Sequence, residues 1–171
     1  WRDDARYVES YLSAFPGFYA TGDGGHIDSD GYVYVMGRTD DVINVAGHRL
    51  TTGSLEAAVA THPDVAECAV IGVQDEIKGQ VPRAFVVLSS GATTSPEVIE
   101  AEVIDLVRHM VGPVAALRDV RVVPGLPKTR SGKILRRSMR AIAEGRDEPV
   151  PSTIEDPRVL EDLAALLRTD P

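Results

Sequence analysis

Apolar residues form a series of short runs along this chain, and most of these runs have the character of β-strands. The clearest is YVYVM at residues 32–36, where valines alternate with larger side chains. The turn Asp28-Ser29-Asp30-Gly31 precedes it and predicts a hairpin with a short strand at 25–27. Further strands are predicted at residues 42–45, 65–73, 81–88 and 117–123.

Helical spacing governs the stretches between these strands. Thr52 or Ser54 is placed to cap a helix that His62-Pro63 ends. Ser95, followed by proline and glutamate, predicts a second helix that runs to about residue 111. Its inward face is predicted to carry Ile99, Val103, Leu106 and Met110, and its outward face Glu100, Asp105 and Arg108. Other helices are predicted at residues 1–13, from near Lys133, and at about 158–167.

The order of these elements predicts an α+β fold. Strands and helices that alternate irregularly over about residues 41–144 favour one small body, with helices packed on a short sheet. The polar tetrapeptide at residues 38–41 separates the first two strands from the rest. It is compatible with another hairpin or with a hinge between two bodies, and the spacing alone does not decide between them.

Composition narrows the class of protein. The chain has 171 residues, 43% of them hydrophobic, and a formal net charge of -8, as expected of a soluble domain with an appendage. Its single cysteine, Cys68, excludes an internal disulfide and favours the cytoplasm. We see no apolar run approaching the roughly 18 residues that span a bilayer, and no signal-peptide pattern. The first residue is Trp1 rather than methionine, which suggests an interior piece of a longer protein.

Positive charge is concentrated in one stretch of this acidic chain. Residues 124–140 read PGLPKTRSGKILRRSMR and contain no acidic residue, which indicates an anionic ligand, although such a run is also typical of a solvated helix face. Lys133 follows Ser131-Gly132, where glycine permits close approach to a phosphate or carboxylate. A Walker loop is excluded because the glycine spacing differs and Ile134 follows the lysine. Nucleic-acid binding is disfavoured because no aromatic residues interrupt the basic run.

Three motifs, in order, resemble the late core motifs of the AMP-forming acyl-CoA synthetases. They are YATGD at residues 19–23, GRTDDVINVAGHRL at 37–50 and PKTRSGKILRR at 127–137. Within that adenylate-forming superfamily, KGQVP at 78–82 and TIEDP at 153–157 are most similar to the acetyl- and propionyl-CoA synthetase branch. The resemblance covers only the C-terminal part of such enzymes. It implies the end of a large N-terminal domain at residues 1–39, a mobile C-terminal α+β domain at 40–145, and a tail at 146–171.

The resemblance also implies roles in adenylation. Such enzymes join a carboxylate to ATP, normally with Mg²⁺, and then transfer the acyl group from AMP to coenzyme A (CoA). Lys133 matches the catalytic lysine that bridges the carboxylate and the α-phosphate. Asp23 matches the ligand of the ribose hydroxyls, with Arg38 nearby and Arg49 at phosphate. Asp40 falls at the hinge about which the small domain swings.

For the second step, the resemblance places Ala46 and Gly47 beside the passage for the pantetheine arm of CoA, where the backbone is used. Ala46 replaces the serine common in acetyl-CoA synthetases, which changes little because the side chain is not needed. Arg108 matches an arginine that binds the nucleotide of CoA, although an outward arginine on a helix is also often only solvated. No metal-ligating residue, nucleic-acid partner or membrane partner is implied. The short-chain acid itself is not specified by these residues.

In the enzymes that this chain resembles, the lysine of the SGK motif is acetylated by a protein acetyltransferase and restored by a deacylase. Acetylation removes the charge of the lysine and switches off adenylation. The resemblance therefore implies that Lys133 is also a regulatory site. A different adenylate-forming family, such as luciferases or peptide-synthetase modules, is the alternative, and the AGHRL and TIEDP motifs argue against it.

Overall fold

The computed structural model describes residues 3–168 and divides the chain into two compact units. The first ends at Asp41 and the second begins at Val42, so the polar tetrapeptide lies at the division. The elements of the first unit are α1 (Asp4–Tyr11), β1 (Asp23–Ile27), β2 (Val33–Arg38) and the short 3₁₀ helix η1 (Thr39–Asp41).

The predicted hairpin of the first unit is confirmed. β1 and β2 pair antiparallel, with Ile27 opposite Val33 and Asp23 opposite Arg38. The Asp28 carboxylate closes the turn by accepting from the N–H groups of Tyr32 and Asp30, each at 2.9 Å. These hydrogen bonds, that of Tyr32 first, hold the pKa of Asp28 below its ordinary value. The local turn chemistry is therefore sufficient to specify this hairpin.

The second unit is an α+β body, which confirms the predicted class. Its strands are β3 (Val42–Val45), β4 (His48–Thr51), β5 (Val65–Asp75), β6 (Gly79–Leu88) and β7 (Asp119–Val122). Its helices are α2 (Thr52–Val59), α3 (Pro96–Met110), the 3₁₀ helix η2 (Pro113–Ala115), α4 (Arg136–Ala143) and α5 (Arg158–Arg168). β4 was not predicted, because its polar residues carry no strand pattern.

One mixed sheet organises this unit, with β6 at its centre. The order is β4-β3-β6-β5, all antiparallel, and β7 pairs parallel with the later half of β6. β2 and β3 belong to different sheets, so the polar tetrapeptide between them does not form a hairpin turn. At the tip of the β5–β6 hairpin, the Asp75 carboxylate accepts from the N–H groups of Ile77 and Lys78.

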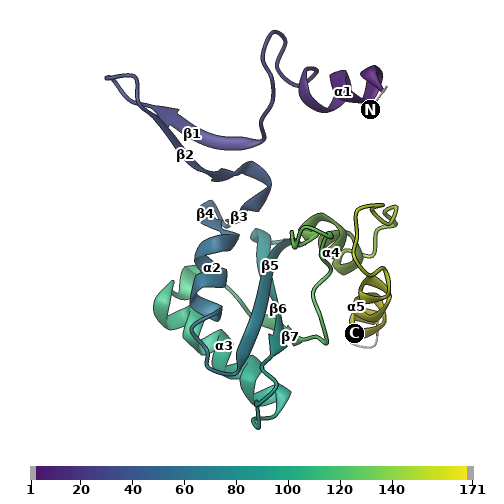
Figure 1. Ribbon diagram of the computed structural model, residues 1–171. Helices are drawn as coiled ribbons and strands as arrows, with labels where there is room; N and C mark the ends of the chain where they lie inside the picture. Colours follow the sequence, from purple (N-terminus) through teal and green to yellow (C-terminus); the bar gives the residue numbers. More distant parts are fainter. Residues whose placement is uncertain (1–2, 169–171) are drawn as a thin grey trace. The chain divides into compact units, whose positions relative to one another are not determined.

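Helices cover both faces of this sheet (Figure 1). α2 and α3 pack on the face that carries Val70 and Val86, while α4 and α5 pack on the face that carries Ile71 and Phe85. Side chains alternate along a strand, so each long strand contributes to both cores. The tail was expected to be extended up to a short helix at 158–167. That helix is α5, and its Leu163 is buried in the second core.

Details of the helices differ from the prediction. Thr51, rather than Thr52 or Ser54, caps α2 by accepting from the N–H of Ser54, because Thr51 is the residue with extended backbone. In α3 the buried residues are Ile99, Val103 and Val107. The inward assignment of Met110 was wrong, since this residue is 55% exposed in the last turn.

A charged cluster connects three elements of the second unit. The Glu56 carboxylate of α2 accepts from the backbone N–H of Val70 at 2.8 Å and binds Arg136 Nη2 through both oxygens, at 2.8 and 2.9 Å. The Glu56 and Arg136 side chains are 17% and 24% exposed. Cys68 lies beside this pair and donates its S–H to the Glu56 carbonyl oxygen at 3.5 Å. Glu56 therefore connects α2 to β5 and to the start of α4.

We expect the thiol of Cys68 to react slowly in the folded chain. Burial, and next the Glu56 carboxylate, raise its pKa to about 11. At pH 8 about one thiol in a thousand is then ionised, against roughly a quarter for an ordinary cysteine. Reaction with a chromogenic disulfide reagent at pH 8 should be about 100-fold slower than in the urea-unfolded chain.

Glu56→Gln removes one cause of the raised pKa and should accelerate the reaction. Glu100→Gln is the matched control, because Glu100 also accepts a backbone N–H, from Val122, but does not act on Cys68. Equal rates in the folded and unfolded chain would contradict this description of Cys68.

Candidate functional site

Lys133 lies on a tight turn rather than at a helix N-terminus. Lys128 and Ile134 form an antiparallel bridge, and Thr129 binds Lys133 twice. The N–H of Thr129 donates to the Lys133 carbonyl at 2.8 Å, and the N–H of Lys133 donates to Thr129 Oγ1 at 3.1 Å. Gly132 completes the turn with a φ of 82°, which favours glycine. The predicted helix starts later, at Arg136, because the bridge keeps the preceding residues extended.

Acidic residues neutralise much of the basic stretch. Lys128 Nζ lies 2.6 Å from Glu67 Oε2, and Arg136 is bound to Glu56. The more exposed Arg137 pairs with Glu148 at 2.7 Å. None of these acids lies in residues 124–140, so the sequence pattern did not reveal them.

By contrast, the Lys133 side chain is exposed, and within residues 3–168 it makes no hydrogen bond or ion pair. Only its backbone N–H and C=O are used, both by Thr129. A cation held on a structured turn with a free ammonium group is suited to binding an anionic ligand. Binding of an anionic ligand by Lys133 stays a prediction from the sequence, and its exposed side chain is compatible with it.

Ala46 and Gly47 form the two-residue turn between β3 and β4. Their φ angles are 49° and 89°, as a primed hairpin turn requires. The N–H of Ala46 donates to the Lys78 carbonyl at 2.8 Å, which joins this turn to the tip of the β5–β6 hairpin. No atom lies within 4 Å of a Cβ built on Gly47, so its backbone is accessible. Arg49 follows on β4 and is exposed.

Arg108 borders a hollow of about 220 Å³ that contains two further cations. Lys78 reaches it from the hairpin tip and Arg118 from the segment before β7. Sequence reasoning assigned no role to Lys78 or Arg118. The KGQVP motif drew attention to Lys78, but nothing in the sequence marks Arg118, which comes close to Arg108 only through packing. Since the Lys78 carbonyl also binds Ala46, the hollow and the turn are neighbours.

In the first unit, the structure brings Asp23 and Arg38 together. They are cross-strand partners in the β1–β2 hairpin, and both are exposed. The Arg38 guanidinium lies over Gly22, where an added Cβ would be 3.0 Å from its Nη2 atom. Asp40 lies in η1, the last element of this unit.

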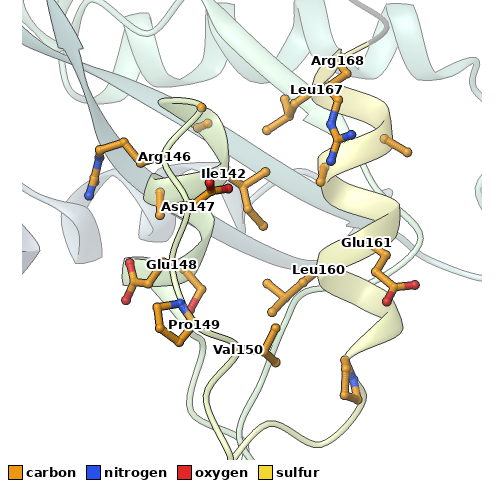
Figure 2. Close-up of a pocket in the computed structure, with 17 residues that line it drawn as sticks. Ile142, Arg146, Asp147, Glu148, Pro149, Val150, Leu160, Glu161, Leu167 and Arg168 are labelled. Atoms are coloured by element: carbon orange, nitrogen blue, oxygen red, sulfur yellow. The ribbon is translucent and has the colours of Figure 1, made fainter.

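A larger hollow than the one beside Arg108 lies elsewhere in the second unit. It has a volume of about 880 Å³ and is bounded by α4, the segment 145–150 and α5. Figure 2 shows its lining, with Ile142 from α4 and Leu160 from α5 on its two sides. None of the residues predicted to act in catalysis or binding lines it. Size therefore does not identify the site in this chain.

Within residues 3–168, no three His, Cys, Asp or Glu side chains gather in a way that would hold a metal ion. In the same part of the chain, no helix is long and apolar enough to cross a bilayer.

Comparison with known proteins gives consistent relatives. An uncharacterised protein of Pseudomonas aeruginosa is 56% identical over 98% of this chain and 27% of its own length. The mitochondrial acyl-CoA synthetase short-chain family member 3 of Pongo abelii is 45% identical over 98% of this chain and 24% of its own length. The acetyl-coenzyme A synthetase of Penicillium chrysogenum is 47% identical over 95% and 24%, respectively. This chain thus spans about a quarter of the length of these relatives.

A solved structure supports the fold. The crystal structure of the anthranilate CoA ligase AuaEII in complex with anthranoyl-AMP matches 84% of this chain and 27% of its own, with 31% identity and a TM-score of 0.65. Residues 54–133 match the family described as AMP-binding enzyme C-terminal domain. Residues 54–133 therefore belong to the family of AMP-binding enzyme C-terminal domains, and the relatives from Pongo abelii and Penicillium chrysogenum are named as an acyl-CoA synthetase and an acetyl-coenzyme A synthetase.

Proposed function

We propose that this chain is the C-terminal part of a short-chain acyl-CoA synthetase. The enzyme would join a short-chain carboxylate to ATP, releasing pyrophosphate, and then transfer the acyl group to CoA, releasing AMP. The observation that supports this most directly is Lys133, whose ammonium group makes no hydrogen bond or ion pair within residues 3–168 while Lys128, Arg136 and Arg137 are paired. The relatives support the reaction class.

In the adenylation step, a carboxylate oxygen attacks the α-phosphorus and the bond to pyrophosphate breaks. Lys133 would contact both the attacking oxygen and an oxygen of the α-phosphate. Its charge would hold the two reactants in line and offset the negative charge between them. Two hydrogen bonds with Thr129, one accepted and one donated by Lys133, restrain the backbone of Lys133, so the direction of the side chain is partly set before substrate binds.

The nucleotide would be bound by Asp23, Arg38 and Arg49. A carboxylate such as Asp23 accepts hydrogen bonds from both ribose hydroxyls, and Arg38 opposite it in the hairpin would add donors. Arg49 is exposed on β4, where its guanidinium would reach phosphate. Mg²⁺ would accompany ATP in the longer enzyme. The described residues offer no cluster of ligands for it, so we assign none of them to the metal.

In the thioester step, the thiol of CoA attacks the acyl carbon, a C–S bond forms, and the bond from this carbon to AMP breaks. The accessible backbone of Ala46 and Gly47 would line the path of the pantetheine arm. The phosphates of CoA would bind in the adjacent hollow, where Arg108 is joined by Lys78 and Arg118. Three cations on one small concave surface suit a ligand with several phosphate groups.

The two steps would use different parts of the second unit, with Asp40 as the hinge. The division between the units falls directly after η1, which contains Asp40. A hinge needs a few residues that absorb backbone rotation at the boundary of two bodies. We also propose a cytoplasmic location, supported by the single free thiol of Cys68, whereas the relative from Pongo abelii is named as mitochondrial.

We expect Lys133→Ala in the longer enzyme to lower the rate of adenylation by about 100-fold or more. Thioester formation from supplied acyl-adenylate should be retained, because Lys133 acts in the first step only. Pyrophosphate release measures the first step and acyl-CoA production the second. Arg130→Ala, which removes a neighbouring exposed cation, is the matched control, and Gly47→Leu should give the reciprocal result. Equal losses in both steps for Lys133→Ala would refute the assignment.

The cationic hollow makes a separate prediction. Arg108→Ala, Lys78→Ala and Arg118→Ala should each raise KM for CoA by roughly 5- to 50-fold, as expected for the loss of one charged contact. The KM for ATP should stay unchanged. Replacing CoA by a pantetheine thiol without the nucleotide should abolish the difference between variant and parent. A KM effect that persists with this shortened thiol would place the three cations outside the nucleotide site.

We further propose that Lys133 is acetylated by a protein lysine acetyltransferase and restored by a deacylase. Lys133 is exposed on a turn, whereas the ammonium group of Lys128 is held by Glu67 at 2.6 Å and its side chain is 27% exposed. Lys78, the third lysine of the chain, borders the hollow. An amino group outside an ion pair, such as that of Lys133, is more accessible to the acetyl group of acetyl-CoA than that of Lys128.

Mass spectrometry after incubation with an acetyltransferase and acetyl-CoA should therefore find Lys133 modified about 10-fold more than Lys128. Lys133→Arg should remove most of the label. Glu67→Gln releases the ammonium group of Lys128 from its ion pair and should raise labelling there. Labelling that falls mainly on Lys78 or Lys128 in the parent chain would exclude the regulatory role of Lys133.

A further inference from the structure

Residues 128–134, which carry Lys133, are called the lysine turn below. The segment 153–155 lies well beyond this turn in the sequence and pairs with the turn as an additional strand. Thr129 and Ile154 form an antiparallel bridge. The N–H of Arg130 donates to the Thr153 carbonyl at 3.1 Å, and the N–H of Glu155 donates to the Lys128 carbonyl at 2.9 Å. Since Lys128 also bridges Ile134 on its other side, residues 128–130 form the middle of a three-stranded patch.

This outer segment is itself firmly anchored. Ile154 is 5% exposed, although it lies between exposed neighbours. Directly after it, the Asp156 carboxylate accepts from the N–H of Arg158 at 3.0 Å, at the start of α5. α5 then buries Leu160 and Leu163 to 7% and 3% exposure. The pairing segment is therefore connected to the second hydrophobic core.

The lysine turn is held from the other side by ion pairs. Lys128 binds Glu67 of β5 at the start of the turn, and Arg136 binds Glu56 of α2 after it. One edge of the 128–130 strand pairs with Lys133 and Ile134, and segment 153–155 pairs with the other edge. Without this segment, Thr129 would lose its neighbour on that edge, and the position of Thr129 determines that of Lys133 through two hydrogen bonds.

We propose that segment 153–155 is a positioning strand for the adenylation lysine, with Ile154 and the backbone N–H of Glu155 as its positioning residues. This inference rests on the proposed function. A lysine side chain has many rotamers, so its reach to two reactants depends on how well its backbone is held. A displacement of about 1 Å in a catalytic group is enough to cost two orders of magnitude in rate. The strand would therefore act on adenylation and not on thioester formation.

The test compares two substitutions at one exposed position of the longer enzyme. Glu155→Pro removes the N–H that binds the Lys128 carbonyl, while Glu155→Ala keeps it. Proline also requires an extended residue before it, and Ile154 lies in an extended bridge. Ile154→Ala loosens the same segment through lost packing, and Ile154→Val should restore most of the function. Ile99→Val in α3, on the opposite face of the sheet, controls for general loss of stability.

Hydrogen exchange of the backbone amides of Arg130 and Lys133 is the first measurement. We expect about 10-fold faster exchange in Glu155→Pro and Ile154→Ala, and no change in Glu155→Ala or Ile99→Val. The second measurement compares the rate of adenylation with the rate of thioester formation. The kcat for adenylation should fall about 10-fold in the same two variants, with unchanged KM for CoA and unchanged acyl-CoA formation from supplied acyl-adenylate.

Three results would overturn the inference. The first is unchanged exchange at Arg130 and Lys133, which would show that the segment does not hold the turn. The second is faster exchange with normal adenylation, and the third is an equal loss in both steps, as a purely structural role would produce. Failure of the proposed function is recognised separately, because Lys133→Ala would then leave adenylation unchanged while the exchange rates still report whether the strand restrains the turn.

Discussion

The pairing of β5 with β6 is the interaction on which the second unit depends. These strands are paired from Val65 to Leu88, and each sends side chains into both hydrophobic cores. A slip by one residue would exchange the two faces, placing Ile71 and Phe85 where Val70 and Val86 belong. The register therefore determines which helices cover which face. It also sets the position of the hairpin tip, and through it the neighbourhood of Lys78 and Ala46.

Ion pairs neutralise part of the positive charge in this domain. The basic stretch looks like one continuous cationic surface in the sequence, but acids from α2, β5 and the segment after α4 pair with several of its members. The Arg136 pair is largely shielded from water, so removing Glu56 alone would leave a poorly compensated charge. What is left accessible is a small number of cations, Lys133 among them. Selective pairing of this kind leaves a few accessible cations in place of one diffuse basic patch.

The two halves of the proposed reaction place different demands on the structure. Adenylation needs one side chain held in a defined direction, and Lys133 lies on a turn restrained by hydrogen bonds and ion pairs. Thioester formation needs an accessible backbone and a place for phosphates, which the Ala46-Gly47 turn and the hollow around Arg108 would supply under the proposed function. These features belong to one unit that begins at Val42, and the proposed hinge at Asp40 would let that unit present first one and then the other. The remaining substrate contacts would belong to the rest of the longer enzyme.

The sequence by itself determined what depends on neighbours along the chain. The Asp28 turn, the β5 and β6 strands, the limits of α3 and the three family motifs were all readable, because turn chemistry and side-chain periodicity are local properties. The burial of Val107 in place of Met110 was not, since it depends on which element covers the last turn of α3. The sequence also did not show which residues pair with the charged side chains, or which segments pair as strands. Glu56 and Arg136 are 80 residues apart, and Arg118, Lys78 and Arg108 meet only when the hairpin tip packs beside α3. Likewise, nothing local in TIEDP shows that it pairs with the lysine turn, because a strand's pattern specifies its faces and not its partner. Tertiary structure alone decided these contacts.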